Sequence, residues 1–381
     1  MAEYTYTSDR NFYLSELEYG NGDTVNYTYD SLGRVIGETF EDGDTVTYAY
    51  DNTGALATVT DSATGRTTTY YYDFTDRLMK YTEKGVDYSH TVGYTYDNIN
   101  NLTAMVETIN GTARTTSYTY DDDNRVTSVT TDGISKTYTY DALGRVEKRI
   151  SGSGTANVIT ETFTYTAPSA TATSGQVKTM RVQGTGFDIT YSYTYDDNGN
   201  ILSVSNGTHT TTYVYDSANQ LVRENNQAGG FTHVWTYDDA GNIQSRTEYA
   251  YTTGSLGSVT DTVNYTYGDE WGDLLTAYDG QSITYDGIGN PTSYYNGTRW
   301  NFTWEHGREL SSMTDGSTTW NFQYGVDGLR TSRTDGTKTY RYIYNGGSLS
   351  QMTVGSDTLT FTYDASGRQR HGTVLCLEEV R

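Results

Sequence analysis

Residues 138–146 read Tyr-Thr-Tyr-Asp-Ala-Leu-Gly-Arg-Val, and this stretch decides the fold because the chain repeats it along most of its length. The same pattern, Tyr-x-Tyr-Asp-x-x-Gly-Arg and then an apolar residue, returns at residues 27–35. It returns with Asn in place of Arg at residues 193–201 and, with Trp235 also in place of the first Tyr, at residues 235–243. A fixed repeat predicts a repeat architecture before any single motif is considered. It also argues against an ordinary enzyme, because an active site occurs once and this pattern occurs many times.

Each copy of the repeat is marked by the residue that follows its second aromatic residue. The clear Tyr-Asp copies end at Asp30, Asp51, Asp73, Asp97, Asp121, Asp141, Asp196, Asp216, Asp238, Asp286 and Asp364. Degenerate copies end at Thr7, Thr166, Gly268, Glu305, Gly325 and Asn345. These copies, about 17 in all, mostly follow one another at intervals of roughly 18 to 25 residues, as in an array of repeated units.

Two intervals between copies are longer than the others. Their extra residues, near 167–175 and 249–257, are rich in Ser, Thr, Gly and Ala, which is typical of loops. We therefore predict one continuous repeat domain over residues 1–367 with two longer loops. Residues 368–381 lose the repeat and are predicted to be a non-repeat tail.

The composition favours an all-β fold with a thin core. The 381 residues include 39 Tyr and only 2 Pro, and Tyr, Thr and Val favour strands over helices. Only 34% of the residues are hydrophobic, which is too few for a thick core of aliphatic side chains. A thin sheet faced with Tyr rings fits better, because Tyr combines an apolar ring with a polar hydroxyl.

One copy of the repeat predicts two strands and two turns. Residues 117–120 alternate, so their two Tyr side chains share one face of a strand. Residues 121–124 are predicted to turn, residues 125–131 alternate again, and Asp132-Gly133 matches a two-residue hairpin turn. The same turn chemistry recurs at Asp42-Gly43, Asn110-Gly111, Asn206-Gly207, Asn296-Gly297, Asp315-Gly316 and Asp335-Gly336.

The residues of the repeat itself are predicted to have structural roles. The Gly should supply the positive φ of a tight turn or a G1 bulge. The Arg is expected to reach back to the carboxylate of its own copy or to lie along a neighbouring Tyr ring. We assign these roles to Tyr29, Asp30, Gly33 and Arg34, and to Tyr140, Asp141, Gly144 and Arg145.

The number of copies also predicts the shape of the sheet. About 17 copies give roughly 34 antiparallel strands, which at ~4.8 Å per strand make a strip on the order of 160 Å long. Such a strip would twist by roughly 20° per strand, and open twisted sheets of this length curl or close. We therefore predict a long antiparallel strip that spirals, with early strands beside later copies, into a hollow shell or part of one.

The motifs at residues 138–146 and 27–35 resemble the Rhs, or YD-repeat, family, and the resemblance covers residues 1 to about 367. One Tyr-Asp pair carries no information, but many copies in phase are specific. The resemblance implies a β-sheet that spirals into a hollow shell, as in bacterial polymorphic toxins, wall-associated proteins, Tc toxin cocoons and the teneurin barrel. In the toxins such a shell encloses a C-terminal effector domain.

The chain departs from the family pattern at its C-terminal side. Family toxins carry Asp-Pro-x-Gly motifs at which the effector is released by self-cleavage. Here Pro168 and Pro291 are the only prolines, and neither follows Asp. We therefore expect a shell segment without the self-cleaving plug and without an effector in residues 368–381.

Charge and cysteine content limit the partners and the location. The net charge of -23 disfavours nucleic acid and anionic membrane surfaces, because both would repel the chain. Cys376 is the only cysteine, so an internal disulfide is excluded. Residues 1–20 do not resemble a signal peptide, and no segment is apolar enough for a membrane span. By resemblance, the location is expected to be secreted or at a bacterial cell surface.

No catalytic, cofactor or metal site is predicted. The five His residues are scattered and do not pair with Cys or Asp at ligand spacing. Residues 121–124 and 196–200 carry several Asp and Asn oxygens that could bind Ca²⁺, but the spacing is not that of an EF-hand loop. These residues stand where the repeat needs a turn, and we interpret them as turn residues.

Three tryptophans of the degenerate copies are the only candidate ligand-binding residues. Trp300 and Trp304 share strand parity and, with Trp320 nearby, could form an aromatic platform for sugar. Packing within the wall is the favoured alternative, since Trp304 stands at the position of the second Tyr.

The sequence therefore predicts a non-enzymatic shell segment that encapsulates or displays a toxin or effector domain. Its expected partners are that cargo or the flanking domains of a longer chain. One alternative is an adhesin that binds carbohydrate or a cell surface. Another is a scaffold that self-associates through open strand edges, because unpaired edges pair with other chains.

Overall fold

The structure is a computed structural model that describes residues 2–8, 11–153, 156–167, 175–268, 272–363 and 369–372. Asp364, Cys376, Pro168, most of the predicted loop at 167–175 and most of the predicted tail lie outside the described residues. The chain divides into two compact units, Met1–Thr119 with Thr284–Arg381 (unit 1) and Tyr120–Ile283 (unit 2). In the part that the structure describes, no helix has the length and apolarity needed to cross a membrane.

All regular elements of the described residues are strands, which confirms the predicted all-β class. The first strands are β1 (Ala2–Tyr6), β2 (Leu14–Tyr19), β3 (Thr24–Tyr29), β4 (Val35–Phe40), β5 (Thr45–Tyr50), β6 (Leu56–Asp61), β7 (Arg66–Tyr72), β8 (Leu78–Gly85), β9 (Tyr88–Tyr96), β10 (Leu102–Ile109) and β11 (Thr112–Tyr120).

Unit 2 continues the same succession of strands. They are β12 (Val126–Thr131), β13 (Ile134–Tyr140), β14 (Val146–Ser153), β15 (Ala156–Tyr165), β16 (Val177–Gly184), β17 (Phe187–Tyr195), β18 (Ile201–Ser205), β19 (Thr210–Tyr215), β20 (Leu221–Asn226), β21 (Phe231–Tyr237), β22 (Ile243–Ala250), β23 (Val259–Tyr267), β24 (Leu275–Tyr278) and β25 (Gln281–Ser282). Residues 251–258, most of the second predicted loop, connect β22 to β23.

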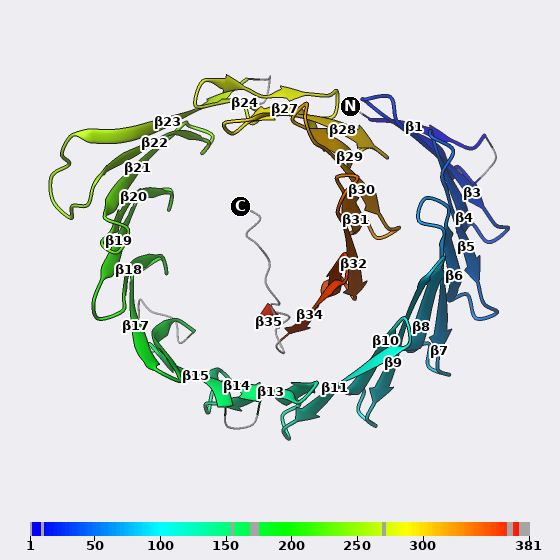
Figure 1. The fold of residues 1–381 in the computed structure, drawn as a ribbon, viewed down its shortest axis with the longest axis horizontal. Helices are drawn as coiled ribbons and strands as arrows, with labels where there is room; N and C mark the ends of the chain where they lie inside the picture. The colour runs from blue at the N-terminus through cyan, green and yellow to red at the C-terminus, as the bar shows by residue number, and fades with distance from the viewer. Residues whose placement is uncertain are drawn as a thin grey trace. The chain divides into compact units, whose positions relative to one another are not determined.

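The last strands return to unit 1. They are β26 (Thr284–Tyr285), β27 (Pro291–Tyr295), β28 (Arg299–Glu305), β29 (Glu309–Thr314), β30 (Thr319–Tyr324), β31 (Arg330–Thr334), β32 (Thr339–Asn345), β33 (Ser348–Val354), β34 (Asp357–Tyr363) and β35 (Gln369–Gly372). Strands β1–β25 belong to a sheet of 25 strands and β26–β35 to a second sheet of 10 (Figure 1). The predicted antiparallel sheet with about two strands per copy is thus confirmed.

The Tyr-Asp-x-x-Gly-Arg motif forms a three-residue hairpin loop. At residues 30–34 the Gly33 amide donates to the Asp30 carbonyl at 3.1 Å, and the Asp30 amide donates to the Arg34 carbonyl at 2.9 Å. Gly33 has a φ of 81° and Gly144 a φ of 77°. This is the positive φ of a G1 bulge, which glycine adopts without steric cost.

The second turn of each copy is more varied than the sequence suggests. Asn110-Gly111 and Asp132-Gly133 are two-residue loops in which both residues have positive φ, as predicted. At Asp42-Gly43 the prediction is wrong, because only Gly43 has positive φ and the Phe40 amide closes a three-residue loop on the Asp44 carbonyl. Asp-Gly suits both loops, since it can fill a two-residue turn or the last two positions of a longer one.

The two faces of the sheet differ in chemistry. In Tyr-Thr-Tyr segments such as residues 118–120, both Tyr rings are half-buried and the Thr between them is exposed. Exposed Thr and Ser hydroxyls pair across neighbouring strands, as Thr194 does with Ser203 at 2.6 Å. One face therefore carries Tyr rings and the other a ladder of hydroxyls.

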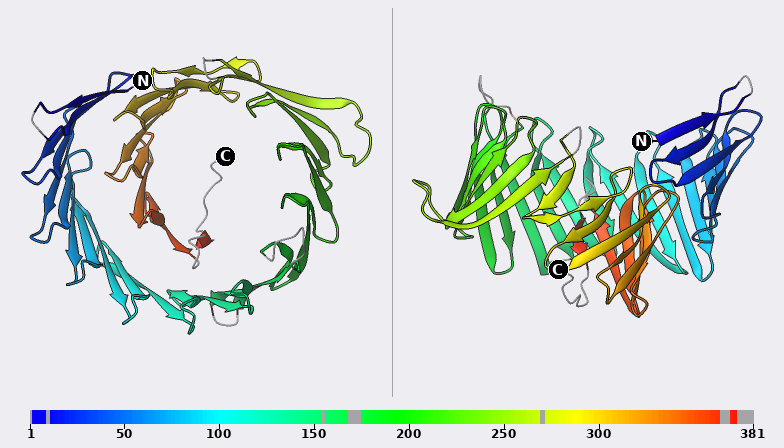
Figure 2. Two further views of the ribbon diagram at one scale, coloured as in Figure 1. Left: turned by 180° about the vertical axis from the view of Figure 1, so that it is seen from behind. Right: turned by 90° about the horizontal axis from the view of Figure 1, so that it is seen from above.

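A second layer covers the Tyr face in unit 1. Strands β28–β34 run alongside the first strands of the same unit (Figures 1 and 2). Buried apolar residues on the two sheets include Val46 and Val92 in the first and Ile343 and Leu359 in the second. The packing of early strands against later copies is thus present within unit 1.

The two layers are in close backbone contact at Gly287. A Cβ added at this position would lie 2.2 Å from the carbonyl oxygen of Gly20, a contact that the backbone must move to relieve. A Cβ on Gly93 in β9 would have no atom within 4 Å. Neither glycine has positive φ, so backbone strain does not distinguish the two positions, and the space available for a Cβ does.

We expect Gly287→Ala to lower the free energy of unfolding by about 1 to 3 kcal/mol, because overpacking a close contact costs this much. Gly93→Ala is the matched control, and its free energy of unfolding should not fall. Denaturant unfolding of both variants, followed by tyrosine fluorescence, measures the difference. Equal stabilities for the two variants would show that the close approach is not maintained in solution.

Candidate functional site

The second Tyr of ten copies forms a hydrogen bond that joins it to the copy before. Its hydroxyl donates to the backbone carbonyl of the apolar residue that follows Gly-Arg in the preceding copy. Tyr50 donates to Val35 at 2.8 Å, and Tyr140 donates to Val126 at 2.7 Å. The same bond, between 2.6 and 3.1 Å, is made by Tyr29, Tyr72, Tyr96, Tyr165, Tyr195, Tyr215, Tyr237 and Tyr363.

The Arg of the motif covers the same Tyr ring. The Arg34 guanidinium lies 4.3 Å from the centre of the Tyr50 ring, and the Arg145 guanidinium lies 4.2 Å from that of Tyr165. Cation–π contacts at this distance are favourable. Arg34 also binds the carboxylate of its own copy, with Nε 2.7 Å from Asp30 Oδ2. Both contacts expected for the Arg are present, and together they connect successive copies.

The Asp of the motif holds the turn through its ionised form. Asp141 accepts hydrogen bonds from the Arg145 Nε and backbone amide and from the Leu143 amide. The side-chain bond from Arg145 is the largest cause that lowers the pKa of Asp141, and the two amides lower it further. In copies with Asn in place of Arg, the amide donates instead, as Asn200 does to Asp196 at 2.9 Å.

The three tryptophans are part of this packing and are all half-buried. Trp304 stands at the second-Tyr position, and its Nε1 donates to the Pro291 carbonyl at 2.8 Å, as the Tyr hydroxyls do in other copies. Trp320 has the Arg333 guanidinium 5.0 Å from the centre of its ring. Trp300 lies on β28 opposite Tyr294 of β27. These contacts favour wall packing over a sugar platform.

A series of polar contacts joins the two layers of unit 1. The partners lie 247 to 284 residues apart, and the later partner generally advances along the chain with the earlier one, from the turn at Asp286 to β34. They are Asn21 with Asp286, Asp23 with Gly307, Asp42 with His306, Ala63 with Gln323, Tyr94 with Asn345 and Arg114 with Phe361. We refer to these contacts as the layer interface.

A buried cluster lies at one end of the layer interface. Glu107, which is 2% exposed, has His90 Nε2 2.9 Å from Oε1, while the Ser350 hydroxyl donates to Oε2. Arg114 lies 3.5 Å from the same carboxylate. Burial alone would raise the pKa of Glu107, but the bonds from His90 and Ser350 and the Arg114 charge outweigh it and lower that pKa.

The order of groups in this cluster does not suit a hydrolase. A serine nucleophile needs an imidazole beside its hydroxyl, with the acid on the far side of the ring. Here the Glu107 carboxylate stands between Ser350 and His90. The cluster instead neutralises a buried acid and connects β10 to β33.

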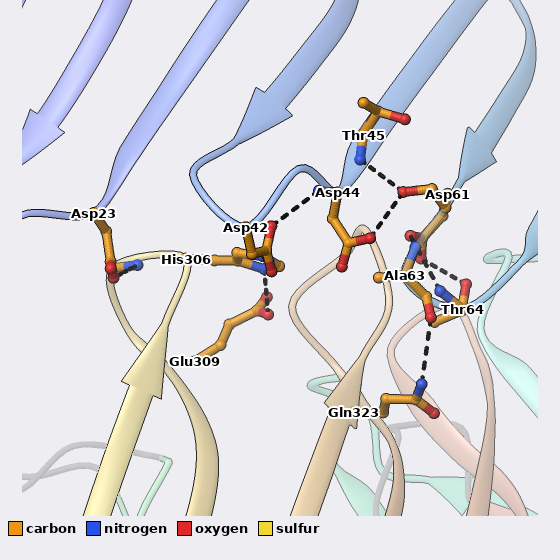
Figure 3. A network of polar contacts seen from close by, with 12 residues as sticks. Asp23, Asp42, Asp44, Thr45, Asp61, Ala63, Thr64, His306, Glu309 and Gln323 are labelled. Carbon is orange, nitrogen blue, oxygen red and sulfur yellow. Dashed lines mark hydrogen bonds and ion pairs between the residues drawn. The ribbon is translucent and has the colours of Figure 1, made fainter.

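His306 lies between two carboxylates at the other end of the layer interface (Figure 3). Its Nδ1 is 3.1 Å from Glu309 Oε2, and its Nε2 is 3.1 Å from Asp42 Oδ2 in the turn between β4 and β5. The bonds to Glu309 and then Asp42 raise the pKa of His306 to about 9 despite its partial burial. The Phe40 ring stacks on the imidazole with the two ring centres 4.1 Å apart.

Sequence spacing could not reveal either cluster. His306 meets Asp42 across 264 residues, and Ser350 meets Glu107 across 243. The acidic stretches considered for calcium act differently, since Asp121 accepts from Arg125 Nε and from two backbone amides in its turn.

Comparison with known proteins identifies the repeat. The family model described as RHS Repeat matches residues 29–64, 120–156 and 195–232. The resemblance to the Rhs family is therefore confirmed, and the chain carries RHS repeats. No curated protein matches the chain in sequence.

Solved structures share the fold at low sequence identity. The chain is similar to the structure described as TcdB2-TccC3-Cdc42, with a TM-score of 0.65 and 15% identity over 99% of this chain. The structure of TcdB2-TccC3 without hypervariable C-terminal region has a TM-score of 0.64, also at 15% identity and 99% coverage. In both cases this chain spans 23% of the other chain.

We expect Tyr50→Phe to lower the free energy of unfolding by about 1 kcal/mol, because it removes one hydrogen bond and leaves the ring in place. Tyr71, which is 47% exposed, provides the control Tyr71→Phe, for which we expect no change. Denaturant unfolding measures both. A Tyr50→Phe variant as stable as its control would show that the Tyr50 hydroxyl does not stabilise the fold.

Acid should weaken the motif turns. The folded-state pKa of Asp141 is lowered, so its contribution is full above the unfolded value of about 4 and is lost as pH falls below it. Asp141→Asn should therefore be less stable than the native chain at pH 7, and the gap should narrow by pH 3. The exposed Asp122→Asn is the control, and urea unfolding at both pH values is the measurement. A gap that stays constant with pH would contradict the charge-based role.

Proposed function

We propose that the chain is a non-enzymatic segment of an RHS-repeat shell that encloses or displays a toxin or effector domain of a longer, secreted or surface-exposed bacterial protein. The observation that carries this proposal is the continuous bonding of copy to copy. Tyr hydroxyls in ten copies and Arg guanidinium groups in several bind one copy to the next, so the described copies share one structural role.

The comparisons support this proposal at the level of fold. The similar structures contain TcdB2 and TccC3 by their descriptions, and this chain spans about a quarter of their length. A segment of that size would need further repeats or flanking domains to complete an enclosure. These are the partners that we propose.

The chemistry of the two faces is consistent with enclosure. The Tyr face offers many rings and hydroxyls along the repeats, and the buried Glu107 cluster lacks the order of a catalytic triad. A surface of this kind can hold an unfolded or loosely folded polypeptide through many weak contacts.

The adhesin alternative rests on Trp300, Trp304 and Trp320. Their half-burial and the bond from Trp304 to Pro291 favour packing, so we rank sugar binding second. Specific binding on a glycan array that is lost in the Trp300→Ala, Trp304→Ala double variant would reverse this order. Concentration-dependent light scattering would instead support self-association through strand edges.

Protease protection tests the proposed enclosure. In the full-length protein that contains this chain, the effector segment should be cleaved at least tenfold more slowly than the same segment alone. Arg114→Ala removes a contact of the layer interface and should speed cleavage. Arg181→Ala, which removes the exposed pair with Asp188, should not. Cleavage of the effector at equal rates with and without the shell would refute enclosure.

A further inference from the structure

We propose that Asp42, Asp44 and His306 bind a divalent metal ion of the zinc class that links the two layers of unit 1. Asp42 and Asp44 belong to the turn between β4 and β5, and His306 to the turn between β28 and β29. The three residues come from opposite sheets, so an ion held by all of them would join the first copies to later ones. This site is separate from the proposed enclosure and does not depend on it.

The geometry brings one donor atom of each residue together. One oxygen of each aspartate and one imidazole nitrogen all lie within 4.8 Å of one another. Two ligands of a tetrahedral zinc ion lie about 3.4 Å apart, since each Zn–ligand distance is about 2.1 Å. Binding therefore requires the donor atoms to draw together, and the exposed Asp42 side chain can rotate about the one bond that holds it.

Each aspartate has one oxygen already held by a neighbouring group, in its own turn for Asp42 and in the next hairpin for Asp44. Asp42 Oδ1 accepts from the Asp44 amide at 2.9 Å, while its Oδ2 faces His306 Nε2. Asp44 Oδ1 accepts from the Ser62 hydroxyl at 3.1 Å. These bonds hold one oxygen of each carboxylate and leave the other for the ion, which would replace the proton on His306 Nε2.

Glu309 is placed as a positioning residue. Its Oε2 lies 3.1 Å from His306 Nδ1, on the side of the ring away from Asp42 (Figure 3). A carboxylate on the second nitrogen of a metal-bound histidine fixes the tautomer and the orientation of the ring. The arrangement of Glu309, His306 and two further carboxylates is therefore that of a metal site with its supporting residue.

The surroundings offer both space and negative charge. Two cavities, of about 260 and 280 Å³, have His306 in their walls. Their walls also contain Asp23, Glu38, Glu41, Asp61 and Glu305. Arg308, the nearest cation in sequence, is turned to the Ile288 carbonyl. A single imidazole does not balance these acids, and a divalent cation would offset part of the remaining negative charge.

The ligand set selects the class of metal. Imidazole with carboxylates suits zinc and related transition ions, whereas calcium prefers oxygen ligands alone. Three protein ligands leave a fourth position for water, as in open zinc sites. We expect the role to be structural, because the ion would connect two turns at the layer interface.

Titration of the metal-free chain with Zn²⁺, followed by calorimetry, tests the proposal, with Co²⁺ as a spectroscopic probe of tetrahedral coordination. We expect one equivalent to bind and to raise Tm, because a ligand that binds only the folded state stabilises it. Asp44→Asn keeps the contacts of His306 with Asp42 and Glu309 and should weaken binding at least tenfold. Glu309→Gln should weaken it by about 10- to 100-fold, as second-layer partners do.

His233→Ala is the matched control, because His233 also lies between two carboxylates, Glu224 and Glu248, and should leave zinc binding unchanged. His306→Ala should abolish the Tm shift. Absence of binding by the native chain would overturn the proposal. So would affinity that is equal in the native chain, Asp44→Asn and His306→Ala, because the ion would then be bound elsewhere.

Discussion

The hydrogen bond from the second Tyr to the preceding copy is the interaction on which the rest of the structure depends. It fixes the distance between one motif turn and the next, and it places the Tyr ring where the preceding Arg can cover it. The Asp carboxylate then holds that Arg. Because the three contacts recur with the repeat, each copy is positioned by its neighbour rather than by a shared core.

This arrangement explains how so few apolar residues maintain a long sheet. Half of the buried apolar side chains in the described residues are valines, such as Val46, Val59 and Val92. The remaining stability has to come from Tyr rings, which contact Arg through their faces and form hydrogen bonds through their hydroxyls. It also has to come from the ionised Asp carboxylates that hold the turns. Tyr suits this position better than Phe, since Phe lacks the hydroxyl. Trp304 shows that an indole N–H can replace the Tyr hydroxyl as the donor.

The repeat allowed the fold class, the strand pairing and the G1 loop at Gly33 and Gly144 to be predicted from the sequence. These features are local, so the spacing of a few residues determines them. The loop at Asp42-Gly43 could not be predicted, because the same dipeptide fits two loop lengths. The clusters at Glu107 and His306 could not be predicted from the sequence either, because their members come from copies more than 200 residues apart.

The pairing of particular early residues with particular later ones across the layer interface restricts how such a chain can evolve. Repeat genes commonly grow or shrink by whole copies, of about 20 residues in this chain. A copy gained between Asp42 and His306 would place a different turn opposite Asp42, and every later pair would be displaced in the same way. Duplications beyond the paired segments would leave the register intact. The layer interface therefore requires a fixed number of copies between the residues that it pairs.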